Sequence, residues 1–420
     1  MDLQRIMTQL YPFRALRPSP GQEAQVDCAP YDTMNREEAV AMATGRPHSF
    51  LHVDRPDIHF PAGHDPHLPE VYQRARSELA RLMAEGALRQ DLTDCFTIYR
   101  QTMEGRQQTG LVCTALTADY DEGIIKKHEF TRPDKEDDRL AHIEATACQC
   151  SPVFLAYRSD AEIDAQIAAP DMRPPDVDLT DDLGVRHELW LVTDPEHIDG
   201  IQTAFQPVDF LYVADGHHRS AAASRCAAAY PERELAQRFL VVVFPHNQLH
   251  VMDYNRVVHD LNGLTAEGLI ERLSEDFEVS RLEREDNRSP DSLRNVGMYL
   301  DGQWYRLSAR HHTFEGMPCV EALDVAILQR HVLTPLLGIE DPRVSDRISF
   351  VGGIRGMDEL ERRVDARGQG VAFSMFPTPM EALLQVADDN DIMPPKSTWF
   401  EPKLRSGLFV NPILDLPTAP

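Results

Sequence analysis

Residues 211–229 read LYVADGHHRSAAASRCAAA and carry the strongest fold signal in the chain. The apolar run 211–214 predicts a buried strand, and Asp215-Gly216 predicts a tight turn after it. The alanine-rich run that follows predicts a helix beginning at about Arg219 or Ser220. A strand that leads at once into a helix is typical of α/β proteins. We therefore expect a mixed α/β fold built around this turn.

The segments on either side extend this fold. RFLVVVF, residues 238–244, predicts a central buried strand, and the runs at 95–103 and 108–116 predict a hairpin across Glu104-Gly105-Arg106. Asn35 and Glu38 predict a capping box at a helix start, and residues 68–85 predict a further helix. A second hairpin is predicted for residues 296–307, VGMYLDGQWYRL. The acidic, proline-bearing stretch 160–184 predicts a helix and loop outside the core. We expect a core over 1–250 with an insertion at about 45–200, and a C-terminal α+β domain over 251–420.

Charge and composition narrow the class of function. The chain has 42 Lys and Arg against 68 Asp and Glu, a net charge of −26, which disfavours nucleic acid and anionic membranes as partners. The longest apolar run, 239–244, is far shorter than the roughly 20 residues of a membrane helix. With no secretory pattern at the start, we expect a cytoplasmic protein that acts on a small molecule. Its oligomeric state is left open.

Seven cysteines are an odd number and are scattered, so we expect reduced thiols rather than a disulfide framework. Cys148 and Cys150 form the only close pair, which is a weak zinc signal without a second pair of ligands.

Common catalytic sequence motifs are also missing. GGIRG at 352–356 has the wrong spacing for a dinucleotide turn, and prolines precede Lys396-Ser397-Thr398 where a phosphate loop needs backbone N–H groups.

The turn at 215–220 has the residues of an anion site. The first N–H groups of a helix are unpaired and its dipole favours negative charge there. Gly216 permits close approach, Arg219 can bind phosphate oxygens, and His217, His218 and Ser220 can donate hydrogen bonds or, for the histidines, move protons. The alternative is that Asp215 only caps the helix and the histidines are surface residues.

Segments over nearly the whole chain resemble a known family. They are PFRALRPSPG, APYDTMNREEA, RPHSFLHV, YRQTMEGRQQTGLV, IIKKHEFTRPDKEDDR, ADGHHRSAAA and MPPKSTWFEPKLRSGL. Together they resemble the prokaryotic family DUF1015 of the ParB/sulfiredoxin superfamily, which is related to free-serine kinases. The resemblance implies a ParB/sulfiredoxin-like core, nucleotide phosphates held by the Gly216-x-x-Arg219 turn, and a phosphate donor, ATP or ADP, with Mg²⁺.

Other ionisable residues are candidates for the same site. Lys126, Lys127, His128 and Glu129 follow an apolar strand and could supply charge and a base, although a solvated charge run is the alternative. Arg106 at the hairpin tip, Arg132, and Lys396 with Ser397 are candidate substrate contacts, against solvated loop positions. The basic tail, about 393–410, is expected to fold back on the core. Asp32 is a candidate base by position, with a turn-capping role as the alternative.

These observations lead to two main hypotheses, and a third, a phosphatase or nuclease on the same turn, ranks last because it would need a metal cluster. The first is a kinase that transfers a phosphoryl group from a nucleotide to a small hydroxyl compound, with free L-serine implied by the resemblance. Its candidate catalytic residues are Asp32, Glu129, His217 and His218. The second is a ParB-like regulatory protein that binds nucleotide without turnover.

Overall fold

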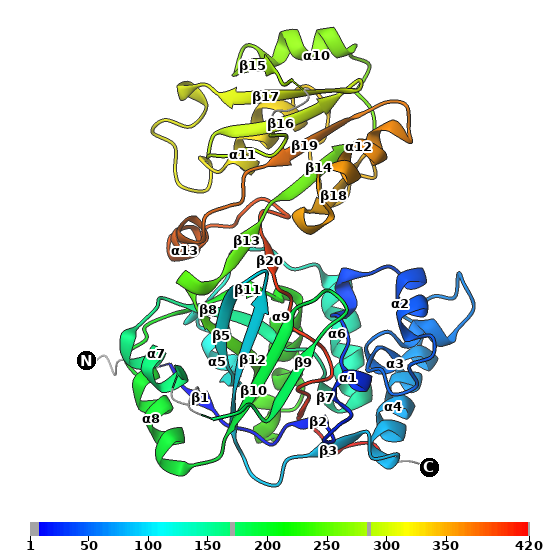
Figure 1. Cartoon of the computed structure of the whole chain (residues 1–420), viewed down its shortest axis with the longest axis vertical. Coiled ribbons are helices and arrows are strands. Elements are labelled where there is room, and N and C mark those ends of the chain that lie inside the picture. Colours follow the sequence, from blue (N-terminus) through cyan, green and yellow to red (C-terminus); the bar gives the residue numbers. More distant parts are fainter. Residues whose placement is uncertain (1–7, 169–172, 284–286, 419–420) are drawn as a thin grey trace. The chain divides into compact units, whose positions relative to one another are not determined.

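The computed structural model of the chain describes residues 8–168, 173–283 and 287–418. These residues form two compact units, and each is described by itself (Figure 1). The first unit comprises the described residues up to Lys127, then Thr131–Leu249, and the described residues from Pro402 onward. The second comprises His128–Phe130 and His250–Glu401. The segment after Glu401 therefore returns to the first unit.

A nine-stranded mixed sheet organises the first unit. Its order is β6 (Ile125–Lys126), β11 (Leu211–Asp215), β8 (Val153–Tyr157), β12 (Arg238–Pro245), β5 (Arg106–Leu116), β4 (Phe96–Met103), β10 (Arg186–Val192) and β9 (Val177–Thr180), with β1 (Leu10–Tyr11) also paired to β5. The predicted central strand is confirmed, because β12 runs parallel to β8 on one side and antiparallel to β5 on the other. The predicted β4–β5 hairpin is confirmed by its register, which pairs Met103 with Arg106.

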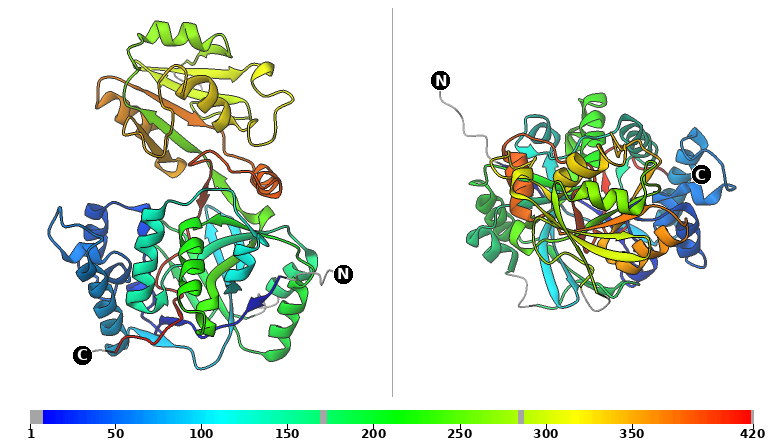
Figure 2. Two further views of the ribbon diagram at one scale, coloured as in Figure 1. Left: turned by 180° about the vertical axis from the view of Figure 1, so that it is seen from behind. Right: turned by 90° about the horizontal axis from the view of Figure 1, so that it is seen from above.

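Helices pack around this sheet. They are α1 (Glu23–Val26), α2 (Arg36–Ala43), α3 (Leu51–Asp54), α4 (Pro69–Ala84), α5 (Thr117–Asp121), α6 (Pro133–Thr146), α7 (Ala161–Ala168), α8 (Pro195–Phe205) and α9 (His217–Ala229). The rear view in Figure 2 shows α6 and α9 side by side, and α9 also contacts β8 and β12. The predicted capping box on α2 is present, because Asn35 accepts from the Glu38 N–H and Glu38 accepts from the Asn35 N–H.

Two short strand pairs tie distant segments of the first unit together. β2 (Leu16–Pro18) pairs with β3 (Leu88–Gln90), and β7 (Cys148–Gln149) pairs with β21 (Asn411–Pro412). Leu16 and Val410 form a further antiparallel bridge. These contacts bring the segment from Pro402 onward against the N-terminal part of the same unit.

The expectation for residues 160–184 is partly wrong. Ile163 and Ile167 of α7 are buried in the core beneath the sheet, and β9 adds an edge strand within the same stretch. An apolar pair at i and i+4 is enough to bury one face of a short helix, even when its other positions are acidic. The acidic composition of the stretch obscured that pair.

The second unit contains a six-stranded antiparallel sheet. Its order is β15 (Phe277–Arg281), β17 (Gln303–Ala309), β16 (Asn295–Leu300), β19 (Val371–Met375), β14 (Tyr254–Val258) and β18 (Ile348–Gly352). The predicted β16–β17 hairpin is confirmed, and both turn residues, Asp301 and Gly302, have positive φ. The remaining elements are the pair β13 (His250–Met252) and β20 (Trp399–Glu401), with α10 (Ala266–Leu273), α11 (Asp324–Leu328), α12 (Met357–Asp365) and α13 (Met380–Asp388).

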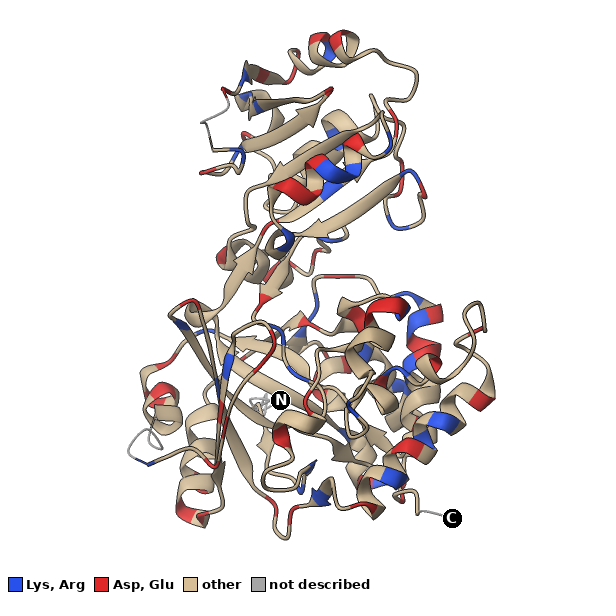
Figure 3. Cartoon of the chain, turned by 45° about the vertical axis from the view of Figure 1, so that its right-hand side comes forward, with Lys and Arg blue, Asp and Glu red and all other residues tan. Residues whose placement is uncertain are grey.

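Charged residues of both signs lie along several helices, among them α4 and α12, as Figure 3 shows. On α4, for example, Glu78 forms ion pairs with Arg74 at 2.6 Å and Arg81 at 2.8 Å. Within the described ranges, no helix is both long and apolar enough to cross a membrane.

Candidate functional site

The turn between β11 and α9 is shaped by Gly216. Its φ of +100° is in the left-handed region, and it serves as the N-cap of α9. The helix begins at His217, two or three residues earlier than the sequence predicted, because the glycine completes the turn in a single residue. A Cβ atom on Gly216 would lie 3.1 Å from both Cζ and Nε of Arg219. The absence of a side chain therefore lets the guanidinium group lie over the turn.

Arg219 is held by oxygen atoms on several sides. One terminal nitrogen donates to the Pro152 carbonyl, and the other lies 3.5 Å from Asp215 Oδ2 and 3.8 Å from Asp32 Oδ2. The Nε atom is buried and has no hydrogen-bond partner among the described residues. Arg219 thus has a fixed orientation at the helix N-terminus with one donor left over.

Asp215 closes the turn from the strand side. Lys403 Nζ, in the segment that returns to the first unit, lies 3.4 Å from Asp215 Oδ2. Burial on its own would raise the pKa of Asp215, but the charges of Lys403 and Arg219 lower that pKa well below its ordinary value. The carboxylate is therefore ionised, and it gathers two cations at one end of β11.

The remaining residues of the turn have different environments. His217 is buried, whereas His218 is half-buried and its Nε2 accepts a hydrogen bond from the Arg132 backbone N–H at 3.1 Å. Ser220 donates from Oγ to the Gly216 carbonyl at 3.2 Å. Arg132, the N-cap of α6, directs its own side chain to Asp134 at 2.9 Å. The N-termini of α6 and α9 therefore lie close together.

Asp32 is brought to the turn from a distant part of the chain. It belongs to a short 3-10 helix, Tyr31–Thr33, and 42% of its side chain is exposed. Its Oδ2 faces the same terminal nitrogen of Arg219 that faces Asp215. The structure thus brings Asp32, Asp215, Arg219 and Lys403 together in the first unit. The side chains of Asp32 and Asp215 are 42% and 34% exposed, and those of Lys403 and Arg219 only 16% and 10%.

Lys126 and Lys127 sit beside β11 but point at aromatic rings. β6 pairs in parallel with β11, and Lys126 Nζ lies 4.1 Å from the centre of the Phe210 ring. Lys127 Nζ lies 3.8 Å from the Tyr120 ring centre, and burial lowers its pKa. The two lysine side chains therefore contact aromatic rings. The alternative, a run of charged side chains surrounded by solvent, does not describe them.

Arg106 lies far from the turn. In the sheet, Asp215 pairs with Phe154 of β8, which pairs with Val242 of β12. Val242 in turn pairs with Val112 of β5. Arg106 is six residues from Val112 along β5, which corresponds to roughly 20 Å at the rise of a β-strand. The structure does not bring Arg106 to the turn.

Four candidates belong to the second unit. The His128 carbonyl accepts from the Met393 N–H at 2.8 Å, and Glu129 follows it in the chain. Ser397 is buried and donates to a backbone carbonyl three residues earlier at 2.6 Å, while Lys396 has a φ of +58°. These residues are organised within their own unit.

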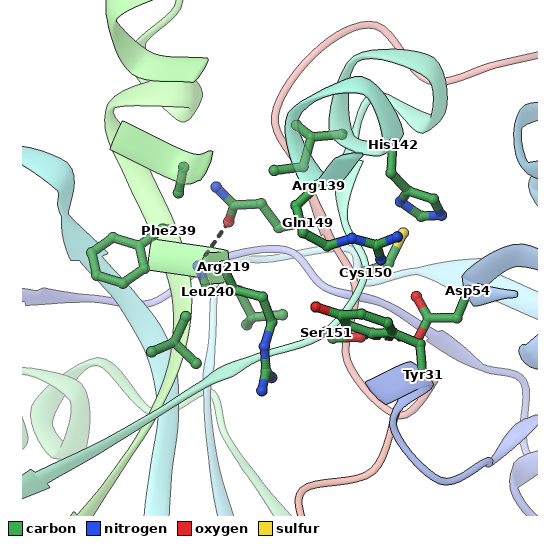
Figure 4. Close-up of a pocket in the computed structure, with 13 residues that line it drawn as sticks. Tyr31, Asp54, Arg139, His142, Gln149, Cys150, Ser151, Arg219, Phe239 and Leu240 are labelled. Atoms are coloured by element: carbon green, nitrogen blue, oxygen red, sulfur yellow. Dashed lines mark hydrogen bonds between the residues drawn. The ribbon is translucent and has the colours of Figure 1, made fainter. Parts of the chain in front are cut away.

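A small cavity lies behind Arg219 in the first unit (Figure 4). Its volume is about 30 Å³, and its polar lining includes Tyr31, Asp54, Arg139, His142, Cys150 and Ser151. Arg139 stacks on Tyr31 with 4.0 Å between the guanidinium carbon and the ring centre, and pairs with Asp138 at 2.7 Å. Sequence reasoning did not select Tyr31, Asp54 or His142 as site residues. Tyr31 stands in a segment quoted for the family resemblance, and Asp54 and His142 lie just after such segments, which is the only signal that could have found them.

Comparison with known proteins places the chain in a family. The model of a family described as "Protein of unknown function (DUF1015)" matches residues 10–326, well over half of the chain. The chain belongs to the DUF1015 family. No curated protein matches this DUF1015 chain.

Solved structures similar to this DUF1015 protein share little sequence with it. A free serine kinase in complex with AMP is 13% identical with a TM-score of 0.37, covering 73% of this chain and 91% of that one. SbnI with a C-terminal truncation, from Staphylococcus aureus, is 12% identical with a TM-score of 0.39, covering 72% and 87%. A conserved hypothetical protein from Pyrococcus furiosus is 12% identical with a TM-score of 0.35, covering 71% and 95%.

Proposed function

We propose that this protein is a nucleotide-dependent kinase that phosphorylates a small hydroxyl compound at the Asp215–Arg219 turn. The observation that carries the proposal is the pair of cations, Arg219 and Lys403, held by Asp215 at the N-terminus of the 13-residue helix α9. A helix N-terminus and two cations form a site for phosphate oxygens. The exposed carboxylate of Asp32 lies across from them.

Each residue of the turn has a proposed task. The terminal nitrogen of Arg219 that faces Asp32 and Asp215 and the first backbone N–H groups of α9 bind phosphate oxygens. Lys403 offsets charge that develops during transfer. The cavity behind Arg219, at about 30 Å³, is much smaller than a nucleotide. The phosphates would therefore bind on the exposed side of the turn, where the substrate can contact Asp32.

Asp32 is the proposed proton acceptor for the attacking hydroxyl group. A general base must be reachable by the substrate, and this carboxylate is 42% exposed and fixed near Arg219. His218 is the second residue at the turn that could hold a proton, although its Nε2 already accepts from the Arg132 N–H. Asp32 therefore ranks first among the candidates in the first unit.

The resemblance also implies Mg²⁺. Carboxylate oxygens are the protein ligands that Mg²⁺ accepts, and Asp215 offers them at the turn, while Asp32 keeps its proposed task as proton acceptor. Bound there with substrate phosphates, the ion would neutralise phosphate charge. The Asp215 carboxylate fits this role.

A coupled assay of nucleotide consumption tests the proposal. Purified protein is incubated with Mg²⁺, ATP or ADP, and a panel of hydroxyl compounds headed by L-serine, beside Arg219→Ala and the control Arg225→Ala. Arg225 is on the same helix but pairs with Asp137 on the surface, so its variant should keep full activity. Acceptor-dependent turnover lost only in Arg219→Ala supports a kinase. Nucleotide binding without turnover on any acceptor would instead support the regulatory protein, and absence of nucleotide binding would reject both.

A further inference from the structure

Three different metal-ligand side chains meet in the cavity behind Arg219. Asp54 at the end of α3, His142 on α6 and Cys150 just after β7 each offer one donor atom, and these atoms lie within 4.8 Å of one another. All three residues are buried, with exposed fractions of 1%, 3% and 5%. Figure 4 shows the three side chains converging from separate elements.

Each donor is prepared by its neighbours. The Nε2 of His142 is 2.9 Å from the Val53 carbonyl, to which it can only donate, so the ring's lone pair is on Nδ1. Metal-binding histidines commonly hold their other N–H on a carbonyl in this way. Asp54 Oδ2 accepts from Ser151 Oγ at 2.9 Å, whereas Oδ1 is buried and has no hydrogen-bond partner among the described residues.

The buried Oδ1 points to a missing partner in the cavity. A carboxylate oxygen removed from water without a hydrogen-bond donor is unfavourable, although the charges of Arg139 and Arg219, which line the same cavity, also act on Asp54. The cavity, about 30 Å³, has room for an ion or a water molecule. A water molecule could donate to the carboxylate and to the imidazole lone pair, so it is the alternative occupant that the experiment must distinguish from an ion.

We propose that Asp54, His142 and Cys150 bind one divalent transition-metal ion, with zinc as the best fit and a water molecule as the fourth ligand. Sulfur, imidazole and carboxylate ligands together are typical of zinc sites, whereas Mg²⁺ takes oxygen ligands. The Cys150 thiol would lose its proton to solvent on binding. Thiolate and carboxylate then balance the charge of the ion, and the nearby Arg139 is already paired with Asp138. This site is independent of the proposed kinase activity.

Metal content of untagged protein, measured by elemental analysis and native mass spectrometry, tests the proposal. After zinc loading and exhaustive dialysis, the wild type should retain one equivalent of zinc, and so should Cys226→Ala, which removes another buried thiol. Cys150→Ala and the nearly isosteric Asp54→Asn should lose it. Cobalt substitution should give a thiolate-to-metal charge-transfer band that disappears in Cys150→Ala.

The wild type alone also tests the proposal, so variants that fail to fold do not obscure the result. A strong chelator should lower its melting temperature, and added zinc should restore it. Wild-type protein that retains no zinc, gives no charge-transfer band with cobalt and melts at the same temperature with and without chelator would overturn the proposal in favour of a buried water.

Discussion

Arg405 and Asp27, 378 residues apart in the chain, form a buried two-point ion pair, with Nε to Oδ1 at 2.8 Å and NH2 to Oδ2 at 2.7 Å. The other terminal nitrogen of Arg405 contacts Asp181 at 3.1 Å. This pair anchors the segment that carries Lys403, so the position of Lys403 at the turn depends on it.

We expect Arg405→Ala to destabilise the first unit by about 3 to 5 kcal/mol, because the substitution leaves two buried carboxylates without their cation. Urea unfolding followed by circular dichroism measures the loss. The control is Arg233→Ala, which breaks an ion pair with Asp415 whose side chains are 47% and 86% exposed, and which should leave the unfolding midpoint almost unchanged. Equal midpoints for the two variants would contradict the anchoring role.

Gly216→Ala should weaken both stability and nucleotide binding. The substitution puts a Cβ at a φ of +100° and within 3.1 Å of the Arg219 guanidinium group. Gly123→Ala is the matched control, since its φ is +80° but open space surrounds it. The control should cost about 1 to 2 kcal/mol from backbone strain alone and should bind nucleotide normally. Calorimetric titration measures the affinity of each variant for ADP, which should be lower for Gly216→Ala. Identical affinities would show that the added Cβ does not displace Arg219.

Asp119 predicts a pH dependence of stability. Burial, with help from Glu122, raises the pKa of this carboxyl group to about 6. Because the folded state holds the proton more tightly than the unfolded state, whose pKa is about 4, this contribution to stability is complete below pH 4 and is lost as the pH rises through 6. Asp119→Asn should therefore stabilise the protein at pH 8, by about 3 kcal/mol at most, and have little effect at pH 4. Unfolding curves at both values check the sign, and an equal effect at the two would refute it.

Asp32→Asn should reduce kcat by about 100- to 10,000-fold while nucleotide affinity changes little, because the amide can still occupy the space but cannot accept the hydroxyl proton. Steady-state kinetics and nucleotide titration provide the two readouts. Asp199→Asn on α8 is the control for losing one acidic charge. If Asp32→Asn lost nucleotide affinity and kept its kcat, the carboxylate would be a binding residue and not a base.

Local signals in the sequence were sufficient for most elements of the sheet. The strand at 238–244, the hairpin across Glu104-Gly105 and the Asn35–Glu38 capping box all depend on residues within a few positions of one another. Where a local signal was weak, the prediction was less exact. The acidic stretch around Ile163 contains a buried helix face, and the helix after Gly216 begins two or three residues earlier than predicted.

The sequence predicted that Asp215, Gly216 and Arg219 lie together at one turn, because the strand, the glycine and the start of the helix are contiguous in the chain. Only the packing of distant segments shows that Lys403 pairs with Asp215, that Asp32 faces Arg219, and that Asp54, His142 and Cys150 share a cavity. Spacing and periodicity describe interactions within a turn or two of the chain. Contacts between segments hundreds of residues apart depend on strand pairing such as β7 with β21 and on core packing, for which no short motif exists.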